Sequence, residues 1–299
     1  MPQISSKSLF DNLLQQITVY EAQEAKEIVF WLMEFYLGLK KIDILSDKAI
    51  DNQVLINWKN IIERINSNEP IQYILGETEF FGRKFLVNSN VLIPRPETEE
   101  LVQLVINEQQ ALPIFGEGWE GLNRTSTILD LGTGSGCIAI SLAKELPNFQ
   151  VFAWDISEKA LETAQKNAEL NNANVIFEKA DILNHSLIHS FTHSLNIIVS
   201  NPPYVTKNEI DFMQKNVLDF EPHLALFVEN NDPLVFYKSI AEIAHKNLII
   251  NGLLIVEINE SLAQETADLF VKKGFSEVEI IKDIYQKDRF VRAWLRKKD

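Results

Sequence analysis

Cysteine is almost absent from this sequence of 299 residues, which contains only Cys137. One cysteine cannot form an intramolecular disulfide framework or a cysteine-based zinc site, and it is typical of a reducing compartment. Long hydrophobic runs are also missing, because the most apolar early stretch, 28–39, is interrupted by Glu34 well short of the roughly 18 residues of a membrane span. The first residues show no signal-peptide pattern. We therefore expect a cytoplasmic protein without a membrane segment.

Basic residues are scarce, with 28 Lys and Arg against 42 Asp and Glu, which gives a formal net charge of -14. Proteins that bind nucleic acid through its phosphates carry the opposite sign, so no direct nucleic-acid binding is expected. The remaining composition, 46% hydrophobic and 23% charged, is that of a globular protein and excludes disordered, collagen-like and coiled-coil chains. The length suits two domains.

The first part of the chain has the apolar spacing of helices. Apolar residues recur at intervals of three and four, as at Leu9, Leu13 and Ile17, which predicts an all-helical domain of about four helices over residues 1–69. The segment 70–93 is richer in β-forming residues and is broken by glycines, so it predicts a β-hairpin connector.

From Thr127 onward the chain alternates short apolar runs with amphipathic ones, which predicts an α/β domain with a doubly wound, mostly parallel sheet within residues 94–299. A helix should begin at Pro96, which precedes several carboxylates, and end near Gln110. Parallel strands are expected at 127–131, 150–154, 175–178, 196–200 and 253–257. Two later β-rich runs, 277–281 and 290–295, are too close for a crossover helix and predict antiparallel pairing at one edge of the sheet.

A glycine-rich loop, Gly132-Thr133-Gly134-Ser135-Gly136, lies between an apolar strand and an apolar helix. Glycines at this place let the backbone approach a ligand at the helix N-terminus, which predicts a small-molecule cofactor. A dinucleotide fingerprint has glycine at the sixth position, where this chain has Cys137, so the spacing favours S-adenosylmethionine over NAD. The alternative is a tight turn that only needs small residues.

Two acidic residues follow the next predicted strands. Asp155 ends the second strand, where a carboxylate can accept hydrogen bonds from both ribose hydroxyls of an adenosine cofactor. Its alternative role is to cap the helix that begins near Ser157. Asp181 follows the third strand, where the adenine edge would lie, and we include the adjacent Ile182 among the cofactor contacts; Ile182 could instead belong to the sheet core.

The sequence Asn201-Pro202-Pro203-Tyr204 follows the fourth predicted strand, next to the glycine loop in a doubly wound sheet. A planar NH2 group on an sp2 carbon is a poor nucleophile, and two acceptors, the Asn201 side-chain oxygen and the Pro202 carbonyl, can hold it in line with an activated methyl group. The paired prolines stiffen the loop and Tyr204 offers a face for a planar group. We predict that Asn201, Pro202 and Tyr204 carry the catalysis and that Asn201 also contacts the cofactor; a plain strand-ending turn is the alternative.

With these loops the chain resembles the class I S-adenosylmethionine-dependent methyltransferases that act on amide or exocyclic amino nitrogen. More narrowly, it is similar to the family of bacterial release-factor glutamine methyltransferases. The resemblance extends over Pro70-Ile71-Gln72-Tyr73-Ile74-Leu75-Gly76, Glu79-Phe80-Phe81-Gly82, Leu92-Ile93-Pro94-Arg95-Pro96-Glu97-Thr98-Glu99 and Asp288-Arg289-Phe290-Val291.

This resemblance implies the substrate and the role of each loop. It implies methyl transfer to the glutamine of the Gly-Gly-Gln motif in class-1 peptide chain release factors, with residues 1–69 as a substrate-docking domain, 70–93 as the connector and 94–299 as the methyltransferase domain. Residues 132–136 and Asp155 would then bind the cofactor, and residues 201–204 would hold the glutamine amide, with Arg95 and Glu97 shaping the site. We expect a monomer without a metal ion.

The chain also departs from the family pattern. Asn259 stands where the family usually has glycine, the stretch 228–233 lacks the usual glycine, and Ile182 occupies a place where some members have an aromatic residue. His185, His189 and His193 have a helical spacing of four, but without cysteine or acidic partners they indicate a solvated loop rather than a zinc site.

Three other functions remain possible on the sequence. A ribosomal-protein glutamine methyltransferase would share the fold and chemistry, although the Arg95-to-Glu99 segment favours the release-factor enzymes. A DNA amino-methyltransferase would also use an Asn-Pro-Pro-aromatic loop, but it needs a basic surface for the phosphates. The third is a binding scaffold without catalysis.

Overall fold

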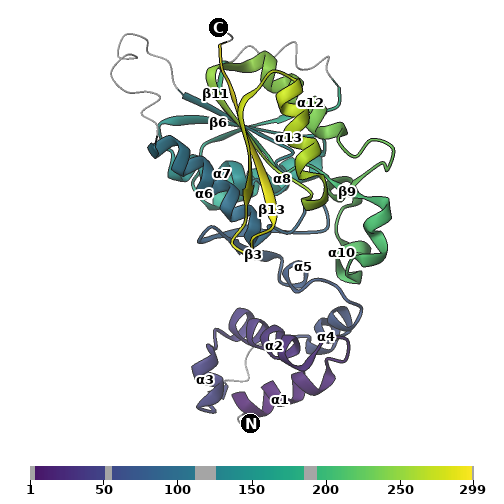
Figure 1. Cartoon of the computed structure of the whole chain (residues 1–299). Coiled ribbons are helices and arrows are strands. Elements are labelled where there is room, and N and C mark those ends of the chain that lie inside the picture. Colours follow the sequence, from purple (N-terminus) through teal and green to yellow (C-terminus); the bar gives the residue numbers. More distant parts are fainter. Residues whose placement is uncertain (1–3, 51–55, 112–125, 185–193, 298–299) are drawn as a thin grey trace. The chain divides into compact units, whose positions relative to one another are not determined.

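The computed structural model describes residues 4–50, 56–111, 126–184 and 194–297 (Figure 1). The chain forms two compact units, one of residues 1–77 with 214–220 and one of residues 78–213 with 221–299. His185, His189 and His193 lie outside the described residues. No helix within the described ranges is both long enough and apolar enough to cross a membrane.

The first unit is helical, as the periodicity predicts. Its helices are α1 (Ser6–Gln16), α2 (Ala22–Leu37), α3 (Lys41–Leu45), α4 (Trp58–Asn66), α5 (Ile71–Leu75) and α10 (Lys215–Phe220). The apolar stripes of α1 to α5 meet in one core, in which Leu13, Val29, Leu32 and Met33 are almost completely buried. The sequence did not predict the short antiparallel pair of β1 (Ile4–Ser5) and β2 (Ala49–Ile50), nor the helical turn α5 at the start of the connector.

A β-hairpin follows, of strands β3 (Glu77–Phe80) and β4 (Arg83–Leu86). The two residues between them, Phe81 and Gly82, have φ of 49° and 67°, which is the backbone of a type I′ hairpin turn. The backbone N–H of Phe81 donates a 2.9 Å hydrogen bond to the Glu99 carboxylate. The predicted hairpin is confirmed.

The second unit is built on a seven-stranded sheet in the order β12-β13-β11-β8-β5-β6-β7. The strands are β5 (Ser126–Leu131), β6 (Phe149–Asp155), β7 (Val175–Lys179), β8 (Leu195–Ser200), β11 (Leu248–Glu257), β12 (Ser276–Lys282) and β13 (Asp288–Leu295). The five from β7 to β11 are parallel, and β13 is antiparallel to both of its neighbours. The predicted strands and antiparallel pairing are confirmed. The edge strand is β12, and β13 lies between it and β11.

Helices cover both faces of this sheet (Figure 1). One face packs against α6 (Pro96–Ala111), α7 (Cys137–Glu145) and α8 (Glu158–Leu170), and the other packs against α12 (Val235–Asn247) and α13 (Ala263–Lys272). Neighbouring residues of a strand point to opposite faces, so Ile128 and Leu129 are buried in different cores. Short elements connect the layers: β9 (Val205–Thr206), η1 (Lys207–Phe212), α11 (His223–Leu226), β10 (Phe227–Val228) and η2 (Glu260–Leu262).

The two loops singled out in the sequence lie at the same edge of this sheet. Leu131, the last residue of β5, pairs in register with Ser200, the last residue of β8. The glycine loop and the Asn201 loop begin at the next residue of each strand. The fold therefore places them side by side at the carboxyl ends of two adjacent parallel strands, where open α/β sheets bind ligands.

Candidate active site

The glycine loop needs its glycines for backbone conformation and for packing. Gly132, Gly134 and Gly136 have φ of 73°, 53° and 82°, in the left-handed region. A Cβ at Gly136 would lie 2.9 Å from Ile140 Cδ1 and 3.1 Å from Ala164 Cβ, whereas one at Gly134 would meet nothing within 4 Å. Gly136 is thus required by packing against α7 and α8, and Gly134 leaves open space beside the backbone.

Beneath the loop lies a buried carboxylate. Asp130 accepts a 2.6 Å hydrogen bond from the Thr133 hydroxyl. Burial raises the pKa of Asp130 to about 7, against the lowering effect of the bonds from Thr133 and the Ala139 backbone. The hydrogen bond between Thr133 and Asp130 keeps the Thr133 side chain directed toward strand β5.

Asp155, at the end of β6, binds the glycine loop directly. Its Oδ2 accepts a 2.8 Å hydrogen bond from Gly134 N, and its Oδ1 accepts one of 2.9 Å from Ser157 N. Burial raises the pKa of this carboxyl, while the backbone N–H groups lower it. The alternative in which Asp155 caps helix α8 is wrong, because Ser157 is the N-cap and its hydroxyl accepts from Ala160 N.

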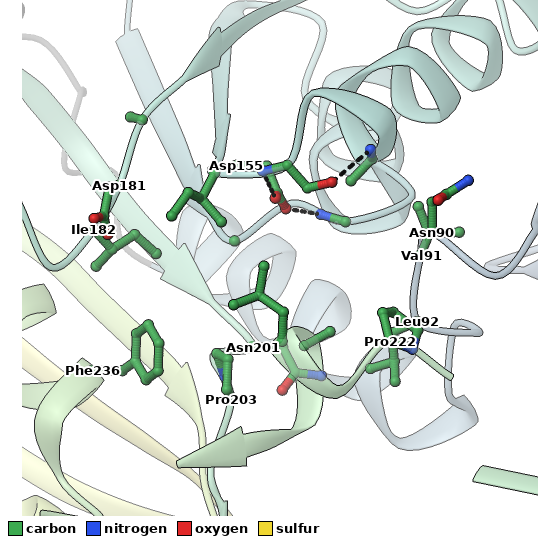
Figure 2. Close-up of a pocket in the computed structure, with 18 of the residues that line it drawn as sticks. Asn90, Val91, Leu92, Asp155, Asp181, Ile182, Asn201, Pro203, Pro222 and Phe236 are labelled. Carbon is green, nitrogen blue, oxygen red and sulfur yellow. Dashed lines mark hydrogen bonds between the residues drawn. The ribbon is translucent and has the colours of Figure 1, made fainter. Parts of the chain in front are cut away.

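A cavity of about 240 Å³ lies next to Asp155 and the glycine loop (Figure 2). Asp155 and Asn201 lie on opposite sides of it, and Ile182 and Phe236 form an apolar wall. Of the predicted cofactor contacts, six line this cavity: Gly132, Gly134, Asp155, Asp181, Ile182 and Asn201. A pocket of this kind, apolar with a few polar groups at defined places, is typical of a cofactor site.

Three predicted cofactor contacts do not line the cavity. Thr133 is turned toward Asp130, and the Ser135 carbonyl accepts a 2.9 Å hydrogen bond from Asn167 Nδ2. Gly136 is buried against α7 and α8. Gly132 and Gly134 thus face the cavity, whereas Thr133, Ser135 and Gly136 make contacts within the protein that hold the shape of the loop.

The sequence did not predict the residues that close the cavity from other parts of the chain. They are Asn90, Val91 and Leu92 before α6, Pro222, Leu224 and Ala225 around α11, and Phe236 in α12 (Figure 2). Leu92 begins the family motif that continues to Glu99, but the other residues belong to no motif, so no local pattern marks them as cavity residues.

A second, smaller cavity of about 60 Å³ adjoins the first. The two share Leu92, Asn201 and Ala225 among their lining residues. Of the predicted substrate contacts, the second cavity is lined by Asn201, Pro202, Tyr204 and Arg95, whereas Pro203 lines the first and Glu97, in the first turn of α6, lines neither. Asn201 therefore lies where the two cavities meet.

A chain of hydrogen bonds holds Asn201 and Tyr204 from behind. Asn201 Nδ2 donates to Thr98 Oγ1 over 3.2 Å, and this hydroxyl donates to Glu257 Oε2 over 2.8 Å. The Tyr204 hydroxyl donates to Glu257 Oε1 over 3.1 Å. Burial raises the pKa of Glu257 to about 7, and burial beside Glu257 raises the pKa of Tyr204. The sequence did not predict that Thr98 and Glu257 belong to the site.

Two further contacts fix the surroundings of Tyr204 and Arg95. The Arg95 guanidinium lies 2.5 Å from the buried Glu221 carboxylate, which also accepts from Ile93 N. Asn259, the departure from the family pattern, donates from Nδ2 to the Tyr204 carbonyl over 3.3 Å and to the Glu209 carboxylate over 3.0 Å. This asparagine therefore ties the loop 201–204 to η1.

The fold and the two adjoining cavities define a class I methyltransferase. A solved structure titled as a methyltransferase from Pyrococcus furiosus has the same fold, with a TM-score of 0.50 and 19% identity over 80% of this chain and 100% of that chain. The family model "Methyltransferase small domain" matches residues 120–220, and "PrmC N-terminal domain" matches residues 12–76.

Comparison with curated proteins gives the family. The chain is 46% identical to the release factor glutamine methyltransferase of Flavobacterium psychrophilum, over 93% of this chain and 95% of that protein. It is 44% identical to the protein of the same name from Bacteroides thetaiotaomicron, over 92% and 94%, and 36% identical to that of Bacillus subtilis, over 93% and 94%. The chain belongs to the release factor glutamine methyltransferase family. The predictions of a methyltransferase and of S-adenosylmethionine as its cofactor are confirmed.

Proposed function

We propose that this protein transfers the methyl group of S-adenosylmethionine to the side-chain amide nitrogen of the glutamine in the Gly-Gly-Gln motif of class-1 peptide chain release factors. The names of its relatives support this substrate. The observation that carries the proposal is the position of Asn201, which lines both the larger cavity and the smaller one beside it. A substrate amide that Asn201 holds in the smaller cavity would therefore lie next to S-adenosylmethionine in the larger cavity.

The larger cavity fits the cofactor. The Asp155 carboxylate can accept from ribose hydroxyls, Asp181 and Ile182 can receive the adenine, and Gly132 and Gly134 allow the close approach of a ligand to the backbone. When bound, the cofactor supplies a methyl group activated by a sulfonium centre. The apolar wall that includes Ile182 and Phe236 would help to keep water out of the cavity around the bound cofactor.

The smaller cavity fits a flat primary amide. The Asn201 side-chain oxygen and the Pro202 carbonyl can accept the two N–H bonds of the amide, and Tyr204 lies at the same cavity. Two acceptors fix the direction of a weakly nucleophilic nitrogen, and alignment of this kind is a main source of rate enhancement. The amide nitrogen would bond to the methyl carbon as the carbon–sulfur bond of the cofactor breaks and S-adenosylhomocysteine leaves. The methylated nitrogen would then lose one proton to water, and because an N-protonated amide is strongly acidic, a strongly basic side chain is not required.

The test is methyl transfer from labelled S-adenosylmethionine to a purified class-1 release factor. The matched control is the same factor with the motif glutamine changed to alanine, and a ribosomal protein and duplex DNA are assayed in parallel. We expect label on the motif glutamine alone, located by mass spectrometry. Label on DNA or on the ribosomal protein only, with the release factor unmodified, contradicts the proposed substrate.

The catalytic loop is tested with Asn201→Ala. We expect turnover to fall by roughly 100-fold or more, the scale of loss when a reacting group is misplaced. Affinity for S-adenosylmethionine, measured by calorimetry, should change far less. Near-normal turnover in this variant contradicts the proposed amide contact.

We further propose that residues 1–69 dock the protein substrate, that residues 94–299 form the methyltransferase domain joined through 70–93, and that the enzyme acts as a monomer in the cytoplasm without binding nucleic acid directly. The net charge of -14 supports the absence of direct nucleic-acid binding, and the single cysteine supports a cytoplasmic location. A truncated protein of residues 70–299 that methylates a free glutamine-containing peptide but not the intact release factor would support the docking role.

A further inference from the structure

The side chain of Asn201 has two ends of similar shape and opposite chemistry. Its oxygen accepts hydrogen bonds and its NH2 group donates them. A substrate NH2 group needs the Asn201 oxygen as its acceptor. A rotation of the Asn201 amide by 180° would instead turn the Asn201 NH2 group toward the substrate NH2 group, and two donors cannot form a hydrogen bond. Something in the protein must therefore select one of the two orientations.

Thr98 makes this selection in the structure. The Asn201 NH2 group donates to Thr98 Oγ1, 3.2 Å away, which directs the amide oxygen elsewhere. Thr98 is 3% exposed, so water does not replace this bond readily. Thr98 follows Pro96 and Glu97 in the first turn of α6, and its backbone N–H is bound to the Arg95 carbonyl.

Glu257 in turn fixes the hydroxyl of Thr98. A hydroxyl has one hydrogen, and that of Thr98 is donated to Glu257 Oε2 over 2.8 Å, so only the lone pairs of Oγ1 face Asn201. The other oxygen, Oε1, accepts from the Tyr204 hydroxyl. Glu257 is 2% exposed, and the charged groups that act on it are Arg289 from β13 and Glu97 from α6.

We propose that Thr98 and Glu257 are positioning residues, which hold the Asn201 amide with its oxygen toward the substrate nitrogen. The proposal rests on the proposed function, because it assigns the orientation that amide methylation requires. Without the Thr98 hydroxyl, the Asn201 NH2 group has no acceptor at this place and the wrong orientation becomes accessible.

The principal variant is Thr98→Val, which keeps the shape of the side chain and removes the hydroxyl. We expect kcat for the release factor to fall by at least about 10-fold, as for other small misplacements of a reacting group. The dissociation constant of S-adenosylmethionine should stay within a factor of two, and KM should change less than kcat. Thr98→Ser, which restores the hydroxyl, should recover most of the lost turnover.

The matched control is Thr266→Val. Thr266 is also a buried threonine in the first turns of a helix, α13, where its hydroxyl donates to the Leu262 carbonyl. Neither Thr266 nor Leu262 lines either of the two cavities. This variant should keep kcat within a factor of two. It measures how much kcat falls when a buried threonine hydroxyl is removed outside the site.

A second variant, Glu257→Gln, tests the other end of the chain of bonds. The Thr98 and Tyr204 hydroxyls donate to different oxygens of Glu257, and a glutamine replaces one of these oxygens by an NH2 group, which cannot accept. One of the two hydrogen bonds is therefore lost, and kcat should fall without loss of cofactor affinity. Thr98→Val with turnover within a factor of two of the unmodified enzyme overturns the inference. Equal losses in Thr98→Val and Thr98→Ser, or a loss of cofactor affinity that parallels the loss of kcat, also overturn it. Failure of the unmodified enzyme to methylate the release factor would instead refute the proposed function.

Discussion

The Ser200 hydroxyl donates a 2.6 Å hydrogen bond to the Leu131 carbonyl. The two residues end β8 and β5, they are fully buried, and each is followed at once by a loop of the site. The bond therefore ties the end of the strand that carries Asn201 to the end of the strand that carries Gly132. The spacing between the cofactor loop and the substrate loop depends in part on this one contact.

Ser200→Ala should lower the free energy of unfolding by about 1–2 kcal/mol, because a buried carbonyl loses a partner. It should also reduce turnover several-fold, since the two loops are less firmly held. Urea denaturation and the methyl-transfer assay measure the two effects. The control is Ser141→Ala in α7, because the Ser141 hydroxyl is buried and has no hydrogen-bond partner among the described residues. A larger loss in Ser141→Ala than in Ser200→Ala would contradict this account.

Asp155→Ala should weaken the binding of S-adenosylmethionine by at least 10-fold while the protein stays folded. The physical reason is the loss of an acceptor for the ribose together with the bond that holds Gly134. Calorimetry gives the affinity and circular dichroism the fold. As a control, Asp232→Ala removes an exposed carboxylate paired with Lys238 and should leave the affinity unchanged. Unchanged affinity in Asp155→Ala would reduce Asp155 to a structural support of the loop.

The pH dependence of the free energy of unfolding should reveal the raised pKa values of the buried carboxyl groups Glu257 and Asp130. Burial raises the pKa of Glu257 from its ordinary value of 4.5 to about 7 in the folded protein. Between these values the folded state keeps a proton that the unfolded state releases, so the free energy of unfolding falls as pH rises from about 4.5 to about 7. Asp130, with a pKa also raised to about 7, acts in the same direction.

We expect Glu257→Gln to reduce this fall, because a glutamine does not ionise. The fall in the free energy of unfolding between about pH 4.5 and pH 7 should be smaller in Glu257→Gln by on the order of 1–3 kcal/mol, since one pKa unit corresponds to about 1.4 kcal/mol. Urea denaturation of both proteins at pH 5 and pH 8 measures it. Identical changes in the two proteins would show that Glu257 has an ordinary pKa.

Much of the fold could be predicted because its signals are local. Each parallel strand is a short apolar run before a glycine, an acidic residue or the Asn201 loop, and the structure extends these strands by only a few residues at their ends. The connector was harder. The residues 71–75 include several β-forming types, yet they form α5, because Pro70 begins the turn and Gly76, with φ of 76°, ends it with a bond to the Gln72 carbonyl.

The parts of the site that depend on distant contacts could not be predicted in the same way. Thr98, Asn201 and Glu257 lie far apart in the chain, and each is ordinary where it stands: a threonine in a first helical turn, an asparagine after a strand, a glutamate at a strand end. Only the three-dimensional arrangement joins them. Asn259 is similar, because its departure from the family pattern was visible in the sequence but its contacts with Tyr204 and Glu209 were not.

The position of β13 has a consequence for how the sheet is assembled during synthesis. β13 is made after every other described strand, yet it lies between β11 and β12 and pairs with both. Until it has emerged from the ribosome, β12 has no partner and β11 keeps an open hydrogen-bonding edge. The sheet therefore cannot be completed strand by strand in the order of translation, and the apolar strand β11 stays an unpaired edge, open to pairing with other chains, until β13 has been made.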